Sequence, residues 1–159
     1  MGHQSAPAHH YPSASCASCH CDGWLDHSQV RSAARNLGVI QFDAAQIVEN
    51  DRIIDIGCGT VASTLTAAAI SPQDHMLGVD ISAPLLDRAR SRASTDGIAN
   101  APFFKADAQS HGFQKDAFDV VVSRLNMMFF ADPVQEFQNL LHSLRPGGRM
   151  AYVAWAGVA

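Results

Sequence analysis

The chain has 159 residues, of which 47% are hydrophobic and 16% are charged, and its formal net charge is −4. This length and apolar content suit one compact domain with a buried core. The acidic balance, interrupted only by the short basic cluster of Arg88, Arg90 and Arg92, argues against nucleic-acid binding. No apolar run approaches the roughly 20 residues of a spanning helix, so we expect no membrane span.

The N-terminal segment is rich in Ser, Ala, Pro and His and lacks periodicity, which predicts a disordered tail over residues 1–23. No charged start precedes an apolar stretch, so we expect no secretory signal and a cytoplasmic protein. Cys16, Cys19 and Cys21 lie in "CASCHC", which partly matches haem-attachment and zinc-binding patterns. Because no export signal and no second pair of ligands accompany them, we expect neither haem nor metal there.

Residues 24–159 form the predicted domain, which opens with a weakly helical segment over Leu25–Val48. Short apolar runs bounded by polar residues predict buried strands at Arg52–Ile56, His75–Asp80, Ala101–Ala106, Asp116–Ser123 and Arg149–Trp155. Helices are predicted at Ser63–Ile70, after an N-cap at Ser82, and after Asp132-Pro133 with an apolar face of Phe137, Leu140, Leu141 and Leu144. "RPGG" at 145–148 predicts a turn. This alternation predicts an α/β fold with a mostly parallel sheet covered on both faces.

Ligands of such sheets bind at the carboxyl ends of the strands, where Gly57, Cys58 and Gly59 follow the first strand. Glycine permits a positive φ and close backbone approach to a ligand. Asp80 ends the second strand, where a carboxylate accepts hydrogen bonds from ribose hydroxyls. Asp55 precedes the glycines and would repel a diphosphate but attract an ammonium group. These residues predict a cofactor with a nucleoside and an amino-acid end, as in S-adenosylmethionine.

The segments between Arg52 and Trp155 resemble, in order and spacing, the class I S-adenosylmethionine-dependent methyltransferases, particularly the small-molecule branch with the ubiquinone and menaquinone methyltransferases. They are "IIDIGCGT", "LGVDIS", "KADAQ", "FDVVVSR", "MFFADP" and "LRPGGRMAYVAW". The resemblance implies a Rossmann-like, doubly wound sheet of about five strands here, with methyl transfer to a small-molecule acceptor. A nicotinamide-dependent oxidoreductase is the alternative enzyme class, but Ala62 stands where its glycine pattern would end.

The resemblance also implies roles for the residues that would hold the methionine part of the cofactor. Asp55 and the loop Gly57–Gly59 would bind this part and pass under the sugar. Ser123 and Arg124, after the fourth predicted strand, would line the methionine side and face the substrate. For Arg124, a surface charge or a salt bridge with Asp132 is an equally open interpretation.

For the nucleoside, the resemblance assigns Asp80 to the ribose hydroxyls and packs Ile81 against the adenine. Asp107 would accept a hydrogen bond from the adenine amino group, and Ala108 would give a backbone contact. The alternatives are that Asp80 only precedes a helix and that Asp107 is a solvated loop acid.

The acceptor side is less defined by the sequence. A general base is needed only for an acceptor such as a phenol or an acidic carbon. His111 and His142 are available by residue type, although we expect both to be surface residues. The apolar run Met127–Phe130 is interpreted as core, with a roof over the substrate as the alternative.

Two departures from the family pattern are visible. Val61 stands where family members usually carry glycine, and a β-branched side chain there is expected to weaken cofactor binding. The family sheet has seven strands, whereas this chain ends just after the fifth predicted strand. That strand would be an exposed apolar edge, available for pairing with a second copy in a homodimer. The alternative to an active enzyme is a non-catalytic or fragmentary methyltransferase-fold protein that acts as a binding or partner module.

Overall fold

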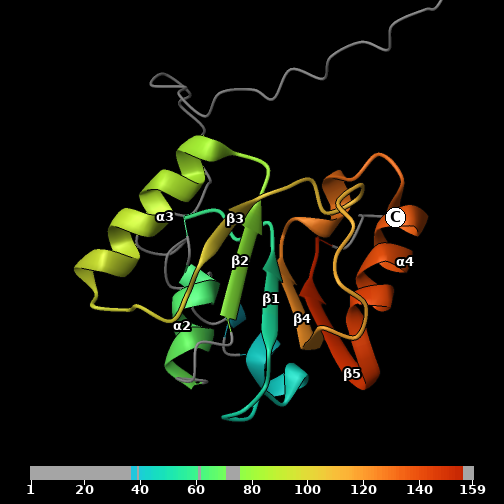
Figure 1. The fold of residues 1–159 in the computed structure, drawn as a ribbon, viewed down its shortest axis with the longest axis horizontal. Helices are drawn as coiled ribbons and strands as arrows, with labels where there is room; N and C mark the ends of the chain where they lie inside the picture. The colour runs from blue at the N-terminus through green and yellow to red at the C-terminus, as the bar shows by residue number, and fades with distance from the viewer. Residues whose placement is uncertain (1–36, 39, 61, 71–75, 156–159) are drawn as a thin grey trace, which may run out of the picture.

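The computed structural model describes residues 37, 38, 40–60, 62–70 and 76–155. They form a sheet of five strands with helices packed on it (Figure 1). The strands are β1 (Ile53–Ile56), β2 (Met76–Asp80), β3 (Phe103–Lys105), β4 (Phe118–Arg124) and β5 (Leu144–Val153). The helices are α2 (Ala62–Ile70), α3 (Ala83–Thr95), the short 3₁₀ helix η1 (Met127–Phe129) and α4 (Pro133–Ser143). Residues 37–38 and 40–45 are also helical.

The strands are all parallel and lie in the order β3-β2-β1-β4-β5, from left to right in Figure 1. From β1 the chain runs outward through β2 to β3, then crosses to β4 and β5 on the other side of β1. The strand order therefore reverses between β1 and β4. In doubly wound sheets the ligand site lies at this reversal, outside the carboxyl ends of the strands.

Each face of the sheet carries its own core, because successive strand residues point to opposite faces. On one face Ile53 packs with Ala67 of α2 and with Phe42. On the other face Ile54 packs with Leu140 of α4. All four residues of β1 are buried. A strand covered on both faces favours apolar side chains at every position, which fits the three isoleucines of β1, with Asp55 as its one polar residue. The predicted doubly wound, parallel α/β fold is confirmed.

The fifth strand differs from the prediction at its start. It begins at Leu144 rather than Arg149, and the predicted turn at 145–148 is a bulge inside the strand. Leu144 pairs with Phe118, and the next pair joins Arg149 to Val120. The intervening residue of β4, Asp119, forms an ion pair with Arg145 in the bulge. This side-chain contact keeps the two strands together where the backbone register shifts.

The predicted helix starts are correct in position, but the side chains of Ser82 and Leu141 differ from their predicted roles. Asp132 caps α4 and accepts a hydrogen bond from the Gln135 N–H at 3.0 Å. Ser82 precedes α3, yet its side chain makes no capping bond to the described residues. Leu140 is fully buried, whereas Leu141 is 59% exposed. Leu141 therefore does not belong to the predicted apolar face, because one residue step rotates a side chain by about 100° around a helix.

Several predictions concern residues outside the described ones. The tail over residues 1–23 with its cysteines and Val61 all lie outside them. Of the predicted helical segment Leu25–Val48, residues 37–38 and 40–45 are described as helical. Within the described part of the chain, no helix is both long and apolar enough to cross a bilayer.

Candidate active site

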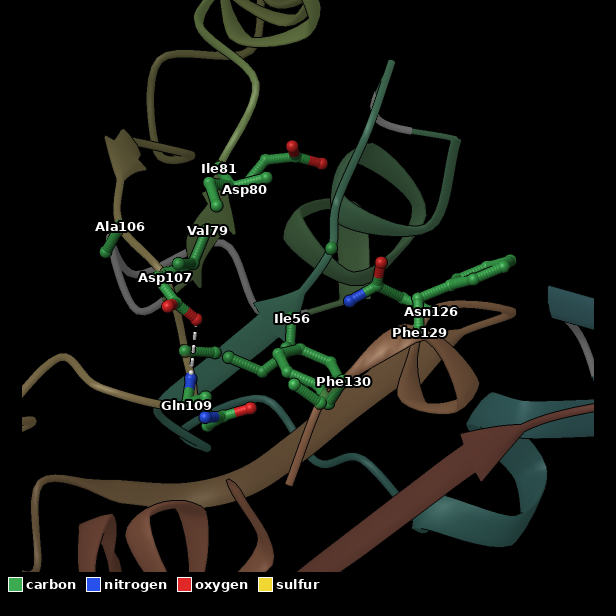
Figure 2. Close-up of a pocket in the computed structure, with 13 residues that line it drawn as sticks. Ile56, Val79, Asp80, Ile81, Ala106, Asp107, Gln109, Asn126, Phe129 and Phe130 are labelled. Atoms are coloured by element: carbon green, nitrogen blue, oxygen red, sulfur yellow. Dashed lines mark hydrogen bonds between the residues drawn. The ribbon is translucent and has the colours of Figure 1, made fainter. Parts of the chain in front are cut away.

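A pocket of about 210 Å³ lies at the carboxyl ends of β1, β2 and β4. Its walls come from the ends of the strands and from the two segments that follow β3 and β4. Figure 2 shows Asp80 and Asp107 entering from one side and Asn126 and Phe130 from the opposite side. The lining residues are Ile56, Gly57, Val79, Asp80, Ile81, Ala106, Asp107, Ala108, Gln109, Asn126, Phe129, Phe130 and Ala131. The pocket therefore lies at the reversal of strand order, where the fold favours a ligand.

Asp80 joins two backbone segments at the end of β2. Its Oδ2 accepts a hydrogen bond from the Gly59 N–H at 2.9 Å, and its Oδ1 accepts one from the Ser82 N–H at 2.8 Å. The carboxylate is therefore held in one orientation between the glycine loop and the start of α3. Next to it, Ile81 is 55% exposed and contributes an apolar wall. Both residues were predicted to lie at a nucleoside site, and both line the pocket.

Asp107 is held by its own loop after β3. Its Oδ1 accepts a hydrogen bond from the Gln109 N–H at 3.0 Å, drawn in Figure 2, and its Oδ2 accepts one from the Ser110 hydroxyl at 3.0 Å. Ala108 is buried against the sheet and also lines the pocket. The predicted nucleoside residues are thus brought together on one wall, with two carboxylates fixed by backbone N–H donors.

The glycine loop turns sharply between β1 and α2. Gly57 and Gly59 have φ values of 67° and 55°, in the left-handed region that other residues rarely adopt. A methyl group on Gly57 would collide with the Asn126 side chain, whereas one on Gly59 would make only an ordinary contact with the Gly57 carbonyl oxygen at 4.0 Å. Cys58 points away from the pocket into the core beside Gly78, and its burial raises the pKa of the thiol. Of the three loop residues, only Gly57 lines the pocket.

Asp55 lies below the glycine loop and does not line the pocket. Its Oδ2 accepts hydrogen bonds from the hydroxyls of Ser63 at 2.8 Å and Thr64 at 2.7 Å, both in α2. Its Oδ1 is buried and accepts no hydrogen bond from the described residues. Complete burial raises the pKa of Asp55 to about 6, against the opposing effect of the two hydroxyl donors. The side chain faces α2 rather than the open cavity, which differs from the prediction.

Ser123 and Arg124 belong to β4 itself, so the prediction that they follow the fourth strand is wrong in position. The Ser123 hydroxyl donates to the Ile56 carbonyl at 2.8 Å, and its carbonyl accepts from Gln41 Nε2 at 2.8 Å. Ser123 is fully buried, and neither residue is among those that line the pocket. In this arrangement Ser123 joins β4 to β1 instead of facing a substrate.

The segment after β4 supplies residues that the motif analysis missed. Leu125 has a φ of 59°, which turns the chain sharply and places Asn126 over Gly57. Met127 is buried in the core, as predicted, but Phe129 and Phe130 line the pocket. The prediction of core is therefore correct for Met127 and for Phe130, which packs against the same cluster while also lining the pocket. It is wrong for Met128 and Phe129, which are exposed. A polar residue two positions after a buried strand was the available signal for Asn126.

The two candidate histidines lie apart from the pocket. The His111 ring packs against Phe104 and Phe113, with ring centroids 5.0 and 4.9 Å away. His142 is exposed near the end of α4. Neither is among the described residues that line the cavity.

Comparison with known proteins agrees with this architecture. Residues 47–155 match a family model described as "Methyltransferase domain". The chain is 31% identical over 113 residues to aklanonic acid methyltransferase DauC from Streptomyces sp. (strain C5), covering 70% of this chain and 51% of that protein. It is 32% identical over 103 residues to a demethylmenaquinone methyltransferase from Clavibacter sepedonicus, covering 65% of this chain and 40% of that protein.

A solved structure shares the fold. The S-adenosylmethionine dependent methyltransferase from Mesorhizobium loti superposes with a TM-score of 0.60 at 27% identity, covering 68% of this chain and 48% of that one. The chain spans about half the length or less of these relatives. The family match nevertheless extends from just before β1 to the end of the described residues. With its parallel strand order and its glycine loop, the chain belongs to the methyltransferase domain family.

Proposed function

We propose that the chain binds S-adenosylmethionine and transfers its methyl group to a small-molecule acceptor. One observation carries the proposal: the carboxylates of Asp80 and Asp107, at the ends of neighbouring strands, lie on one wall of a pocket that begins at Gly57. A ribose offers hydroxyl donors and an adenine offers an amino donor, which two fixed carboxylates can accept. The family to which the chain belongs supports the same function.

The described residues fit the nucleoside part of this cofactor well. Asp80 would bind the ribose, and Ile81, Asp107 and Ala108 would surround the base. For the methionine part, Asp55 Oδ1 is a buried acceptor with no hydrogen-bond partner among the described residues, and it would favour an ammonium group. Because Asp55 does not line the pocket, this role stays a prediction. Roles for Cys58, Gly59, Ser123 and Arg124 in cofactor binding stay predictions. When bound, the cofactor supplies a sulfonium-activated methyl group, so the chain has mainly to orient the acceptor and exclude water.

The methionine side is crowded in this arrangement. A pocket of about 210 Å³ is smaller than the roughly 300–1,000 Å³ typical of ligand sites, and Asn126 occupies the space above Gly57. We therefore expect the Asn126 side chain to move when the whole cofactor binds. The walls at Phe129 and Phe130 favour a flat apolar acceptor of the phenol or quinol class. Two relatives whose names point to aklanonic acid and demethylmenaquinone support that class.

Calorimetric titration with S-adenosylmethionine and with NADH tests the cofactor. We expect binding of the first ligand only, and we expect Asp80→Asn to weaken it by about 10- to 100-fold, the effect of losing a hydrogen bond to a charged group. Asp87→Asn, on the exposed surface of α3, is the matched control and should leave the affinity unchanged. Wild-type affinity in folded Asp80→Asn would remove the carboxylate from the site.

A non-catalytic binding module is the second candidate, and the crowding by Asn126 favours it. A methyl-transfer assay with a panel of phenols and quinols separates the two, because a module binds cofactor without turnover.

We further propose that β5 pairs with a second copy of the chain, since only its β4 side is paired among the described residues and Tyr152 and Trp155 are exposed. Light scattering that gives the monomer mass would exclude this homodimer. The cytoplasmic location stays a prediction.

A further inference from the structure

The loop that follows β3 is attached to α4 by one side-chain amide. Asn139 Nδ2 donates hydrogen bonds to the Ala108 carbonyl at 2.7 Å and to the His111 carbonyl at 2.6 Å. The amide thus uses both of its N–H donors on the two ends of one loop. Asn139 itself lies on α4 and is not among the residues that line the pocket.

A second contact joins the same two segments. Gln109 Oε1 accepts a hydrogen bond from the backbone N–H of Asp132, the N-cap of α4, at 3.0 Å. Within the loop, the Asp107 carboxylate is fixed by the Gln109 N–H and the Ser110 hydroxyl. The direction of this carboxylate therefore depends on where the loop lies, and the position of the loop depends on α4.

We propose that Asn139 is a positioning residue for the base of the nucleoside: by holding the Ala108 and His111 carbonyls, it fixes the Asp107 carboxylate where an exocyclic amino group is recognised. This inference rests on the proposed function and adds a determinant of base specificity to it. A side chain with no amide would leave both carbonyls to water. The loop would then sample several positions, and the carboxylate would lose its fixed direction.

The environment of Glu136 is consistent with close packing of α4 against the loop. Its side chain is fully buried, and neither carboxyl oxygen has a hydrogen-bond partner among the described residues. Burial, and then the negative charge of Asp107, raises the pKa of Glu136 to about 8.

The test compares two ligands that differ only at the base, using the full chain. S-adenosylhomocysteine carries the exocyclic amino group, and S-inosylhomocysteine carries an oxygen in its place. We expect the wild-type chain to prefer the first by about tenfold or more. Asn139→Ala should weaken the first by about tenfold and the second by less than about twofold, so the preference is lost. Asn139→Ser, which retains one donor, should give an intermediate preference.

Asn100→Ala is the matched control, because Asn100 also donates its amide to a carbonyl, that of Ala68, but away from the pocket. It should keep the wild-type preference. Equal weakening of both ligands in Asn139→Ala would reduce Asn139 to a structural role and overturn the inference. If Asn139→Ala does not unfold cooperatively, an unchanged preference in Asn139→Ser overturns it equally. A wild-type chain that binds both ligands equally overturns this inference alone, whereas one that binds neither overturns the proposed function with it.

Discussion

Asp55→Asn is expected to remove a pH dependence of stability that the wild-type chain shows between about pH 4 and about pH 7. Asp55 is fully buried, and its burial raises its pKa from 3.8 to about 6. The folded chain therefore holds a proton on Asp55 over a range where the unfolded chain has released it. Stability consequently falls as the pH rises through this range, which is opposite in sign to the usual ion-paired aspartate.

The size of the effect follows from the same pKa. A pKa difference of one between the folded and unfolded chains is worth about 1.4 kcal/mol, so a rise from 3.8 to about 6 corresponds to about 3 kcal/mol over the whole titration. Between about pH 4.5 and about pH 7.5, where unfolding is practical to measure, about 2 kcal/mol of this should appear. Asparagine keeps an oxygen for the Ser63 and Thr64 hydroxyls, but it does not titrate.

Urea unfolding of both chains at a series of pH values measures the difference. Other carboxyl groups titrate alike in the two chains and cancel, so the difference in unfolding free energy isolates Asp55. We expect the wild type to lose about 2 kcal/mol relative to Asp55→Asn as the pH rises. Parallel curves across the range would show that the Asp55 carboxyl is solvated, and the buried position below the glycine loop would then be wrong.

Four further variants test the site and its support. Gly57→Ala should destabilise the chain by at least about 1–3 kcal/mol and abolish cofactor binding, because its φ is positive and the added methyl group meets Asn126. Gly59→Ala, where the methyl group makes only an ordinary contact, should cost about 1 kcal/mol in thermal unfolding. Asn126→Ala should tighten S-adenosylmethionine but not adenosine in calorimetry, since the amide occupies the space over Gly57. Burial raises the pKa of Asp119, but hydrogen bonds from Arg52 and Arg145 outweigh the effect of burial and lower the pKa overall. Asp119→Asn should therefore lose about 1–3 kcal/mol above about pH 4, and less in acid, by urea unfolding.

The sequence predicted those features that depend on local pattern. Continuous apolar runs located the strands, because a strand covered on both faces has no polar side to interrupt it. Asp80 and Asp107 both line the pocket because Asp80 ends β2 and Asp107 lies two residues after β3, and parallel strands bring their carboxyl ends to one edge. The Asp132-Pro133 pair marked the start of α4 for a local reason as well, namely the preference of caps and first turns.

Features that depend on long-range contacts could not be predicted from local sequence patterns. Ser123 was assigned to the site, but its hydroxyl bonds a carbonyl of β1 that is distant in sequence. The bulge at 145–148 depends on the pairing of Arg145 with Asp119 in another strand, so its glycines and proline predicted only a simple turn. Asn139 gave no signal at all, because only the folded chain brings α4 beside the loop after β3.

The two ends of the pocket differ in how their polar groups are arranged, and this difference should affect the affinity for the cofactor. At the end proposed for the nucleoside, the Asp80 carboxylate accepts hydrogen bonds from the Gly59 and Ser82 N–H groups, so the atoms that would bind the ribose also stabilise the fold. At the end proposed for the methionine part, Asp55 is below the loop and Asn126 covers Gly57, so few polar groups are exposed to an amino acid. A ligand that binds only the folded state stabilises it by RT ln(1 + [L]/Kd), so at a given concentration the ligand of lower Kd stabilises more. Adenosine should therefore stabilise this chain with little rearrangement, whereas the complete cofactor must also displace Asn126, and that displacement reduces its net affinity.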